Sequence, residues 1–405
     1  MRIASRLLGF LCALTVGAPV LAAPPQPGAK VDFSLDHGLR VRWPEQDASL
    51  RLGGRLHLDA GFIDDDVTPM PDNFDVRRGR LYLDGRWDDW RAMVDFDFAH
   101  LSTGWRNVWL GYDGFSHTRI RLGNITMPFG LEENTSSNDV LFAERALPSA
   151  FTPSYGTGLM AQTWGKPFST GMGPAGWTLG AGVYGAPFFD TDYDRHQSDH
   201  VSVAGRATFA PLAGKRRVLQ LGGSVEYRDV TGGDSWRISQ RPESRLAPVL
   251  FGSTLSNVAA VTTVGGEAAA MFGPVLIEGE YMHAFVDRQA SSVLSNPEFQ
   301  GAYAQASWVI TGEHHRYSKT RGTFGGVHPR HCWGALELVT RWSWIDLTDE
   351  SVLGGKSTDI TAGVNWWLRE NMRLMFNYIH VNGVQSGTLL DDDPQIFQFR
   401  AIVAF

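Results

Sequence analysis

The chain has 405 residues, of which 20% are charged, 45 are glycine and 14 are tryptophan, and its formal net charge is −7. This length suits either two or three soluble domains or one large barrel. After the first two dozen residues, no apolar run approaches the roughly 20 residues of a membrane-spanning helix, which excludes a helical membrane protein. A β-barrel remains open, because only alternate residues of its strands face lipid.

The first segment has the pattern of an export signal. Two arginines supply a positive start, an apolar run follows, and small residues end it at a cleavage site. We therefore expect residues 1–23 to be a signal peptide and residues 24–48 to form a periplasmic N-terminal segment. Cys12 would leave with the signal, and Cys332 alone cannot form an intrachain disulfide.

From residue 49 onward, apolar and polar side chains alternate in segment after segment. A period of two indicates strands whose two faces meet different surroundings. Sixteen segments follow this pattern: 49–63, 74–87, 90–99, 105–113, 117–126, 159–164, 177–186, 200–210, 218–228, 261–273, 275–285, 299–310, 334–346, 356–368, 372–381 and 395–405. We expect no amphipathic helix between them. The predicted fold class is all-β, a sixteen-stranded antiparallel transmembrane β-barrel over residues 49–405.

The last predicted strand ends the chain on an aromatic residue, Phe405. One of its faces is apolar, whereas the other carries Gln398 and Arg400. A soluble protein would have to cover both this face and the bare strand edge. A transmembrane barrel covers the face with lipid and the edge with its first strand. The last strand of an ordinary β-sandwich is the alternative for this segment taken alone.

The connections alternate between short turns and long polar loops, as in outer-membrane barrels. Two connections break the rule. Residues 311–333 form a long connection on the short-turn side, and residues 100–104 form a short one on the long-loop side. The loop 127–154 is long enough to fold inward and constrict the pore.

Arginines recur on the polar faces of the predicted strands. A charge on the lipid face costs roughly 2–4 kcal/mol at mid-depth, so these side chains should point inward. A wet lumen with guanidinium groups would concentrate anions. The alternative is that each arginine pairs with a lumenal acid such as Asp59, Asp95, Asp97 or Glu337. The inward set is Arg51, Arg55, Arg78, Arg80, Arg119, Arg121, Arg206, Arg341 and Arg400.

A series of short motifs then points to a family. Gly-Asn-Ile stands at 123–125, Pro-Phe-Gly-Leu-Glu at 128–132, Thr-Ser-Ser at 135–137 and Phe-Ala-Glu-Arg at 142–145. Further motifs lie at 77–78, 311–313, 324–325, 334–338, 363–367 and 373–378. Their order resembles the phosphate-selective porin O/P family of bacterial outer-membrane porins. The resemblance implies a trimer of sixteen-stranded barrels whose inward loop binds anions. Carried over by motif, the anion site would include Arg77, Arg78, Ser136, Ser137 and Arg145.

Two residues depart from that expectation. Glu133 stands where the phosphate-binding members carry a lysine, and an acid there would repel phosphate unless it is paired. Alternation sends Arg77 outward if Arg78 points inward. Either a β-bulge turns Arg77 into the lumen or Arg77 makes a subunit contact.

Other site chemistries have weaker support. A hydrolase would need a serine, a histidine and an orienting group in reach of one another, and no nucleophile motif surrounds Ser136 or Ser137. A zinc site could use a segment whose spacing matches no familiar metal box. Its candidate ligands are His314, His315, His328, His331 and Cys332.

The sequence therefore predicts a non-enzymatic outer-membrane porin for passive diffusion of small inorganic or organic anions, phosphate among them. We expect a homotrimer that contacts outer-membrane lipid and lipopolysaccharide, with no cofactor, metal or nucleic acid. One alternative is a general or organic-anion porin without phosphate selectivity. The other is a soluble exported β-rich binding protein.

Overall fold

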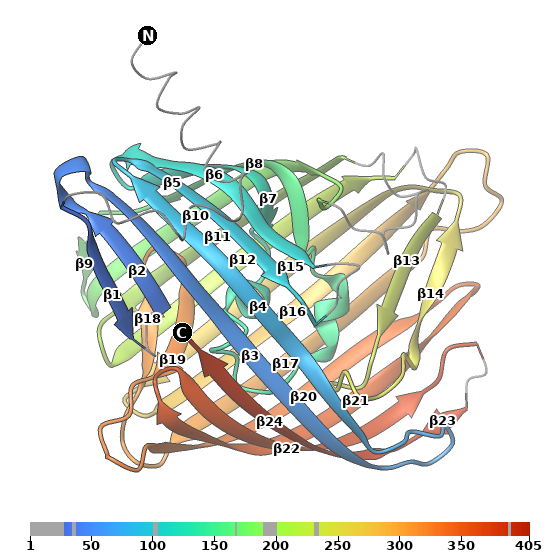
Figure 1. The fold of residues 1–405 in the computed structure, drawn as a ribbon. Helices are drawn as coiled ribbons and strands as arrows, with labels where there is room; N and C mark the ends of the chain where they lie inside the picture. The colour runs from blue at the N-terminus through green and yellow to red at the C-terminus, as the bar shows by residue number, and fades with distance from the viewer. Residues whose placement is uncertain are drawn as a thin grey trace.

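The computed structural model describes residues 28–34, 38–99, 104–166, 168–188, 201–230, 235–387 and 390–405, and over this part of the chain sixteen antiparallel strands close into one barrel (Figure 1). All sixteen predicted segments are barrel strands, with ends within four residues of those expected. The predicted signal peptide, 1–23, lies outside the described residues. The barrel strands are β3 (Ala48–Asp64), β4 (Asn73–Trp87), β5 (Trp90–Asp97), β6 (Trp105–Phe115), β7 (Thr118–Thr126), β8 (Tyr155–Trp164), β10 (Gly173–Gly185), β11 (Val201–Ala213), β12 (Arg217–Asp229), β15 (Val258–Phe272), β16 (Val275–Arg288), β17 (Glu298–Val309), β20 (Ala335–Asp349), β21 (Val352–Arg369), β22 (Met372–Val384) and β24 (Gln395–Ala404).

The barrel closes where β24 pairs with β3. The register runs from Gln395 opposite Asp64 to Ala404 opposite Arg55. Beyond it, the N–H and the C=O of Phe405 each form a 2.9 Å hydrogen bond with the backbone of Gly54. The first and last barrel strands therefore leave no open edge between them over this register, as the alternation and the aromatic end predicted.

A hairpin of β1 (Lys30–Ser34) and β2 (Gly38–Trp43) precedes the barrel and extends its sheet at the end with the shorter turns (Figure 1). Strand β2 pairs with β3 from Leu39 opposite Leu52 to Trp43 opposite Ala48. It thus occupies the part of the β3 edge that lies beyond the end of β24. The segment expected to stand apart from the barrel, 24–48, is joined to it through this ladder; its periplasmic location stays a prediction.

The outer surface of the barrel is apolar at alternate positions. On β3, for example, Leu56 and Leu58 are each 40% exposed, whereas His57 between them is 0% exposed. Leu221 of β12 and Ile360 of β21 also lie on the exposed face. A continuous apolar outer wall suits a lipid environment. None of the described helices is long and apolar enough to span a membrane.

Three inserts enter the lumen. The first is the loop 127–154, which contains α2 (Leu131–Asn134) and η3 (Leu147–Phe151) and folds inward as predicted. The second is the hairpin of β13 (Ser235–Gln240) and β14 (Phe251–Ser256), which packs on β20 and β21. The third is the hairpin of β18 (His315–Ser318) and β19 (Thr323–Val327). It accounts for the long connection 311–333 that broke the expected loop asymmetry.

The inserts pack mainly on one side of the inner wall. Phe129, Phe151 and Phe251 belong to a buried apolar cluster that also contains Phe299 and Ile379 of the wall. The core of the protein therefore lies inside the barrel, between the inserts and strands β15–β17, β20–β22 and β24.

The opposite part of the inner wall, strands β3–β8, is less covered. The side chains of Arg91, Arg106 and Arg119 are 35%, 20% and 18% exposed. On the covered side, those of Arg206 and Arg341 are 5% and 1% exposed. These arginines of the β3–β8 wall are therefore more exposed than those beneath the inserts.

Candidate functional site

A β-bulge brings two successive arginines into the lumen. His57 lies opposite Arg78, but the next residue of β3, Leu58, lies opposite Val76, which leaves Arg77 as the extra residue. The Nε and Nη2 of Arg77 donate to the two carboxylate oxygens of Glu144 at 2.5 and 3.0 Å. Of the two explanations offered for Arg77, the bulge is therefore the correct one.

A chain of alternating charges anchors the inward loop to the wall. Arg400 of β24 donates to both carboxylate oxygens of Asp59 at 2.6 Å, and its Nη2 also donates to Glu144 at 2.7 Å. Arg77 then closes the chain on the other side of Glu144. Burial alone would raise the pKa of Glu144, but Arg77 and Arg400 together hold it well below its usual range. Glu144 is therefore ionised and attaches the loop to β3, β4 and β24.

A second contact joins the same loop to β3 and β4. His57 Nε2 lies 2.9 Å from Asn138 Oδ1, and His57 Nδ1 lies 3.4 Å from Arg78 Nη1. Arg55 Nη1 donates to Ser137 Oγ at 3.1 Å. The Nε atoms of Arg55 and Arg78 are buried and have no hydrogen-bond partner. Two guanidinium groups thus each keep an unbonded Nε, and that of Arg55 bonds the inward loop through Ser137.

Arg145, also expected at the anion site, is used within its own loop. Its guanidinium donates to the carbonyls of Glu132, Glu133 and Thr135 at 3.1, 3.2 and 3.4 Å. The Glu133 carboxylate lies 3.2 Å from Arg145 Nε. Burial raises the pKa of Glu133, and Arg145 opposes that shift. Ser136 accepts the N–H of Asn138 at 3.3 Å, again within the loop. The acid that could repel phosphate is therefore paired.

Several arginines of the barrel wall are also paired. Arg80 donates to Asp97 at 2.9 Å, and Arg206 lies 2.7 Å from Glu267. Arg341 lies 2.6 Å from Glu243. The alternative of structural ion pairs therefore holds for Arg80, Arg206, Arg341 and Arg400. Glu243 was missed because it belongs to the connection between β13 and β14, which alternation cannot place.

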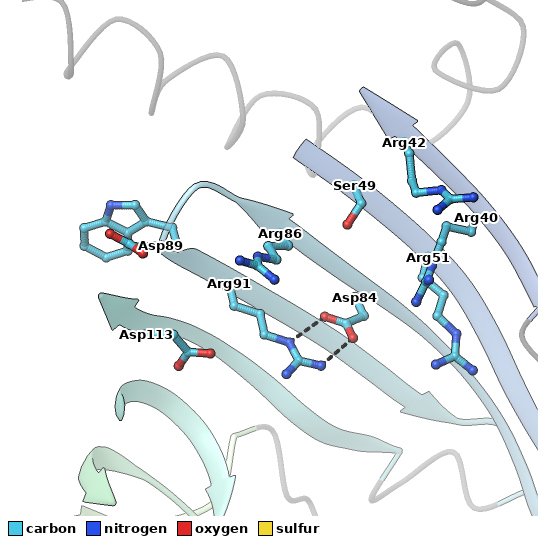
Figure 2. A pocket seen from close by; sticks show the side chains of 10 residues that line it. Arg40, Arg42, Ser49, Arg51, Asp84, Arg86, Asp89, Arg91 and Asp113 are labelled. Atoms are coloured by element: carbon cyan, nitrogen blue, oxygen red, sulfur yellow. Dashed lines mark hydrogen bonds and ion pairs between the residues drawn. The ribbon is translucent and has the colours of Figure 1, made fainter. Parts of the chain in front are cut away.

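The end of the barrel near β1 and β2 contains a cavity of about 400 Å³ (Figure 2). Cross-strand neighbours there carry like charges, since Arg40 lies opposite Arg51 and Arg86 lies opposite Arg91. Arg91 is neutralised by a two-bond pair with Asp84, drawn in Figure 2 (2.9 and 2.6 Å). The cavity is also bordered by Arg42 and Asp89. With Asp113, three aspartates face five arginines, so the cavity carries a net positive charge.

Two further predicted arginines, Arg119 and Arg121, lie on β7. Arg119 lies over the Trp164 ring at 4.7 Å and Arg121 over the Trp109 ring at 4.4 Å. Arg86 and Arg91, at the neighbouring strand ends, also border the cavity but were not among the predicted pore arginines. The alternation that placed Arg80 inward, carried six residues further along β4, would have found Arg86.

Two of the candidate zinc ligands bond to different glutamates, so they do not face a common site. His315 Nε2 lies 2.6 Å from a carboxylate oxygen of Glu337, and His328 Nδ1 bonds to Glu370. In the part of the chain that the structure describes, no three histidine, cysteine or acidic side chains come together as a metal site.

The family model described as "Phosphate-selective porin O and P" matches residues 50–405. The chain belongs to this porin family. The porin is 26% identical to Porin O of Pseudomonas aeruginosa, over 92% of each chain. Among solved structures it is similar to an anion-selective porin from Comamonas acidovorans (TM-score 0.54, 13% identity, 88% of this chain and all of that one). It is also similar to the trimer form of OmpT, an outer-membrane protein of Vibrio cholerae (TM-score 0.52, 10% identity, 88% of this chain and 99% of that one). Family and fold together indicate an outer-membrane porin, in place of the soluble exported binding protein considered as an alternative.

Proposed function

We propose that this porin lets small anions diffuse passively through a pore lined by arginines along β3–β8, without a catalytic step or a cofactor. The observation that carries the proposal is the pair of unused guanidinium donors at the constriction. The Nε atoms of Arg55 and Arg78 are buried without a partner, and Arg55 Nη1 donates to the hydroxyl of Ser137. Burying two cations with few bonded donors is costly, and an anion held beside them would offset part of that cost.

Phosphate is the anion that this arrangement fits best. A guanidinium group presents a planar fork of donors that matches an oxyanion, and it is charged at every working pH. Arg55 and Arg78 come from neighbouring strands, so both could bond one tetrahedral anion while Ser137 supplies a hydroxyl. Chloride would use the charge but not the fork.

The basic cavity supports the preference for anions. Arg40, Arg42 and Arg86 have no ion pair among the described residues, so their positive field would hold anions at that end of the pore. The similar porin from Comamonas acidovorans is anion-selective.

The second candidate is a general or organic-anion porin without phosphate selectivity. Glu144 favours it, because this carboxylate neutralises Arg77 and part of Arg400 at the constriction. Glu133 does the same for Arg145. The site then carries less net positive charge than its arginines alone suggest, which would weaken discrimination between anions.

We also propose that the porin is a homotrimer in outer-membrane lipid and lipopolysaccharide, exported by a signal peptide at residues 1–23. Strand β5 has eight residues. At about 3.4 Å per residue and a tilt of about 45°, it spans about 19 Å, less than the apolar band of about 25 Å. A neighbouring subunit would cover the part of the barrel wall where β5 is too short to span the apolar band. The solved trimer form of the similar OmpT supports the assembly.

Phosphate block of chloride current in planar bilayers tests the site. Arg55→Gln and Arg78→Gln should each weaken block about 10- to 100-fold, since a hydrogen bond to a charged group contributes about 1.5–3 kcal/mol. Arg369→Gln, at the exposed end of β21, is the control with the same charge change. Chloride current that phosphate and organic anions reduce equally, in all four proteins, would favour the second candidate.

A further inference from the structure

His57 is a fully buried histidine on the inner wall, 0% exposed, and the anion site as described above makes no use of it. It lies on β3 between Arg55 and Asp59, the two inward residues that contact arginines or the loop. Its two ring nitrogens bond in opposite directions. Nδ1 faces Arg78 Nη1 on β4, and Nε2 faces Asn138 Oδ1 on the inward loop. Among the described residues, His57 is thus the one side chain that joins Arg78 to Asn138 through hydrogen bonds.

The partners determine the protonation of the ring. A guanidinium nitrogen can only donate, so His57 Nδ1 must accept the bond from Arg78 and carries no proton. A neutral imidazole then carries its proton on Nε2, which donates to the side-chain oxygen of Asn138. Protonation of Nδ1 would place two N–H groups against each other, beside Arg55 and Arg400. The neutral ring is therefore the form that holds both partners.

We infer that His57 is a positioning residue for the anion site: it holds the Arg78 guanidinium in place and ties it to the tip of the constriction loop. This inference rests on the proposed function. Arg78 has no carboxylate within ion-pair distance in the described structure, whereas Arg77 and Arg400 both form ion pairs with Glu144. Its Nε is unused. Without the bond to His57, the guanidinium of Arg78 would keep its charge but lose its fixed orientation.

The orientation of the Arg78 guanidinium and its charge should affect different measurements. Chloride conductance depends on the width and charge of the pore, whereas phosphate block depends on a guanidinium fork aimed at the oxyanion. His57→Phe keeps a ring in place and removes both bonds. We expect its chloride conductance to stay within about twofold of the parent, because Arg78 remains charged. Its half-blocking phosphate concentration should rise about fivefold, the share expected for one lost hydrogen bond.

His57→Gln is the conservative variant, because its amide can accept from Arg78 and donate to Asn138 at once. It should restore most of the phosphate block. Asn138→Ala leaves the His57 ring intact and removes only its bond to Asn138. It should therefore weaken phosphate block less than His57→Phe does. His380→Phe, an exposed histidine on the outer face of β22, is the matched control and should change neither quantity.

The decisive experiment is a double-mutant cycle in planar bilayers with inorganic phosphate as the probe. On an Arg78→Gln background, His57→Phe should cause no further loss of block, because the residue acts through Arg78. Equal losses on both backgrounds would overturn the positioning role while leaving the anion site intact. If phosphate does not block the unmodified porin at all, the proposed function fails and the role of His57 fails with it.

Discussion

Glu144 limits the positive charge at the constriction, so its removal should make the porin more anion-selective. Glu144→Gln keeps the shape of the side chain and leaves an amide oxygen for Arg77, which now donates to it at 2.5 Å. The local charge rises by one unit. At about 6 Å, one unit charge contributes about 0.7 kcal/mol with the permittivity of water and about 2.8 kcal/mol with an effective value of 20. The change favours an anion and disfavours a cation by this same amount, so the ratio of anion to cation permeability should rise at least about 10-fold.

The assay is the reversal potential in a potassium chloride gradient at neutral pH. Glu370→Gln is the control, because it makes the same charge change at an exposed turn where Glu370 pairs with Arg316. An unchanged permeability ratio in Glu144→Gln, or an equal rise in the control, would refute the placement of Glu144 beside the path of the ions.

Three further predictions concern the anchors of the inserts. Arg400→Gln leaves the buried Asp59 without its cation and should lower the free energy of unfolding by about 3–5 kcal/mol; unchanged urea unfolding in detergent would contradict this. The pKa of Glu144 is lowered in the folded protein, so the stability it adds is complete above its unfolded pKa of about 4.3 and is lost as the pH falls through the lowered value. The difference in chloride conductance between the parent and Glu144→Gln should accordingly be constant from about pH 7 to 5 and change only below about pH 4, and a change in that difference near pH 6 would count against it. Arg206 of β11 donates to the carbonyls of Arg321 and Gly322 at the tip of the β18–β19 hairpin, the second at 2.7 Å. Arg206→Gln removes both bonds, so the tip should no longer be held against the wall and single-channel conductance should rise. Equal conductance in mutant and parent would mean that other contacts hold the tip.

The barrel was predictable because its determinants are local. Alternation of side chains along each strand depends only on the period of two, and lipid makes that period visible in the sequence. The closing pair, β24 with β3, followed from the aromatic end and the need to cover an edge. The hairpin β1–β2 and the three inserts were harder. Only the loop 127–154 was expected to enter the lumen, and that expectation came from its length and the family motifs.

The site was predictable in its residue types and not in its pairing. Alternation placed Arg206, Arg341 and Arg400 on the inner wall, and each lies there. Whether such an arginine is free depends on acids in distant segments, as with Glu243 and Arg341, and no local pattern encodes that distance. The bulge at Arg77 is similar, because one extra residue changes the face of a side chain without a signal of its own.

The measurement that tests the central claim most directly is the sign of the reversal potential of the unmodified porin in a tenfold gradient of potassium chloride at low salt. The proposed arginine-lined pore along β3–β8 predicts a potential with the sign set by chloride. A potential with the sign set by potassium would contradict the account, since it would mean that the acids, and not the arginines, control the pore.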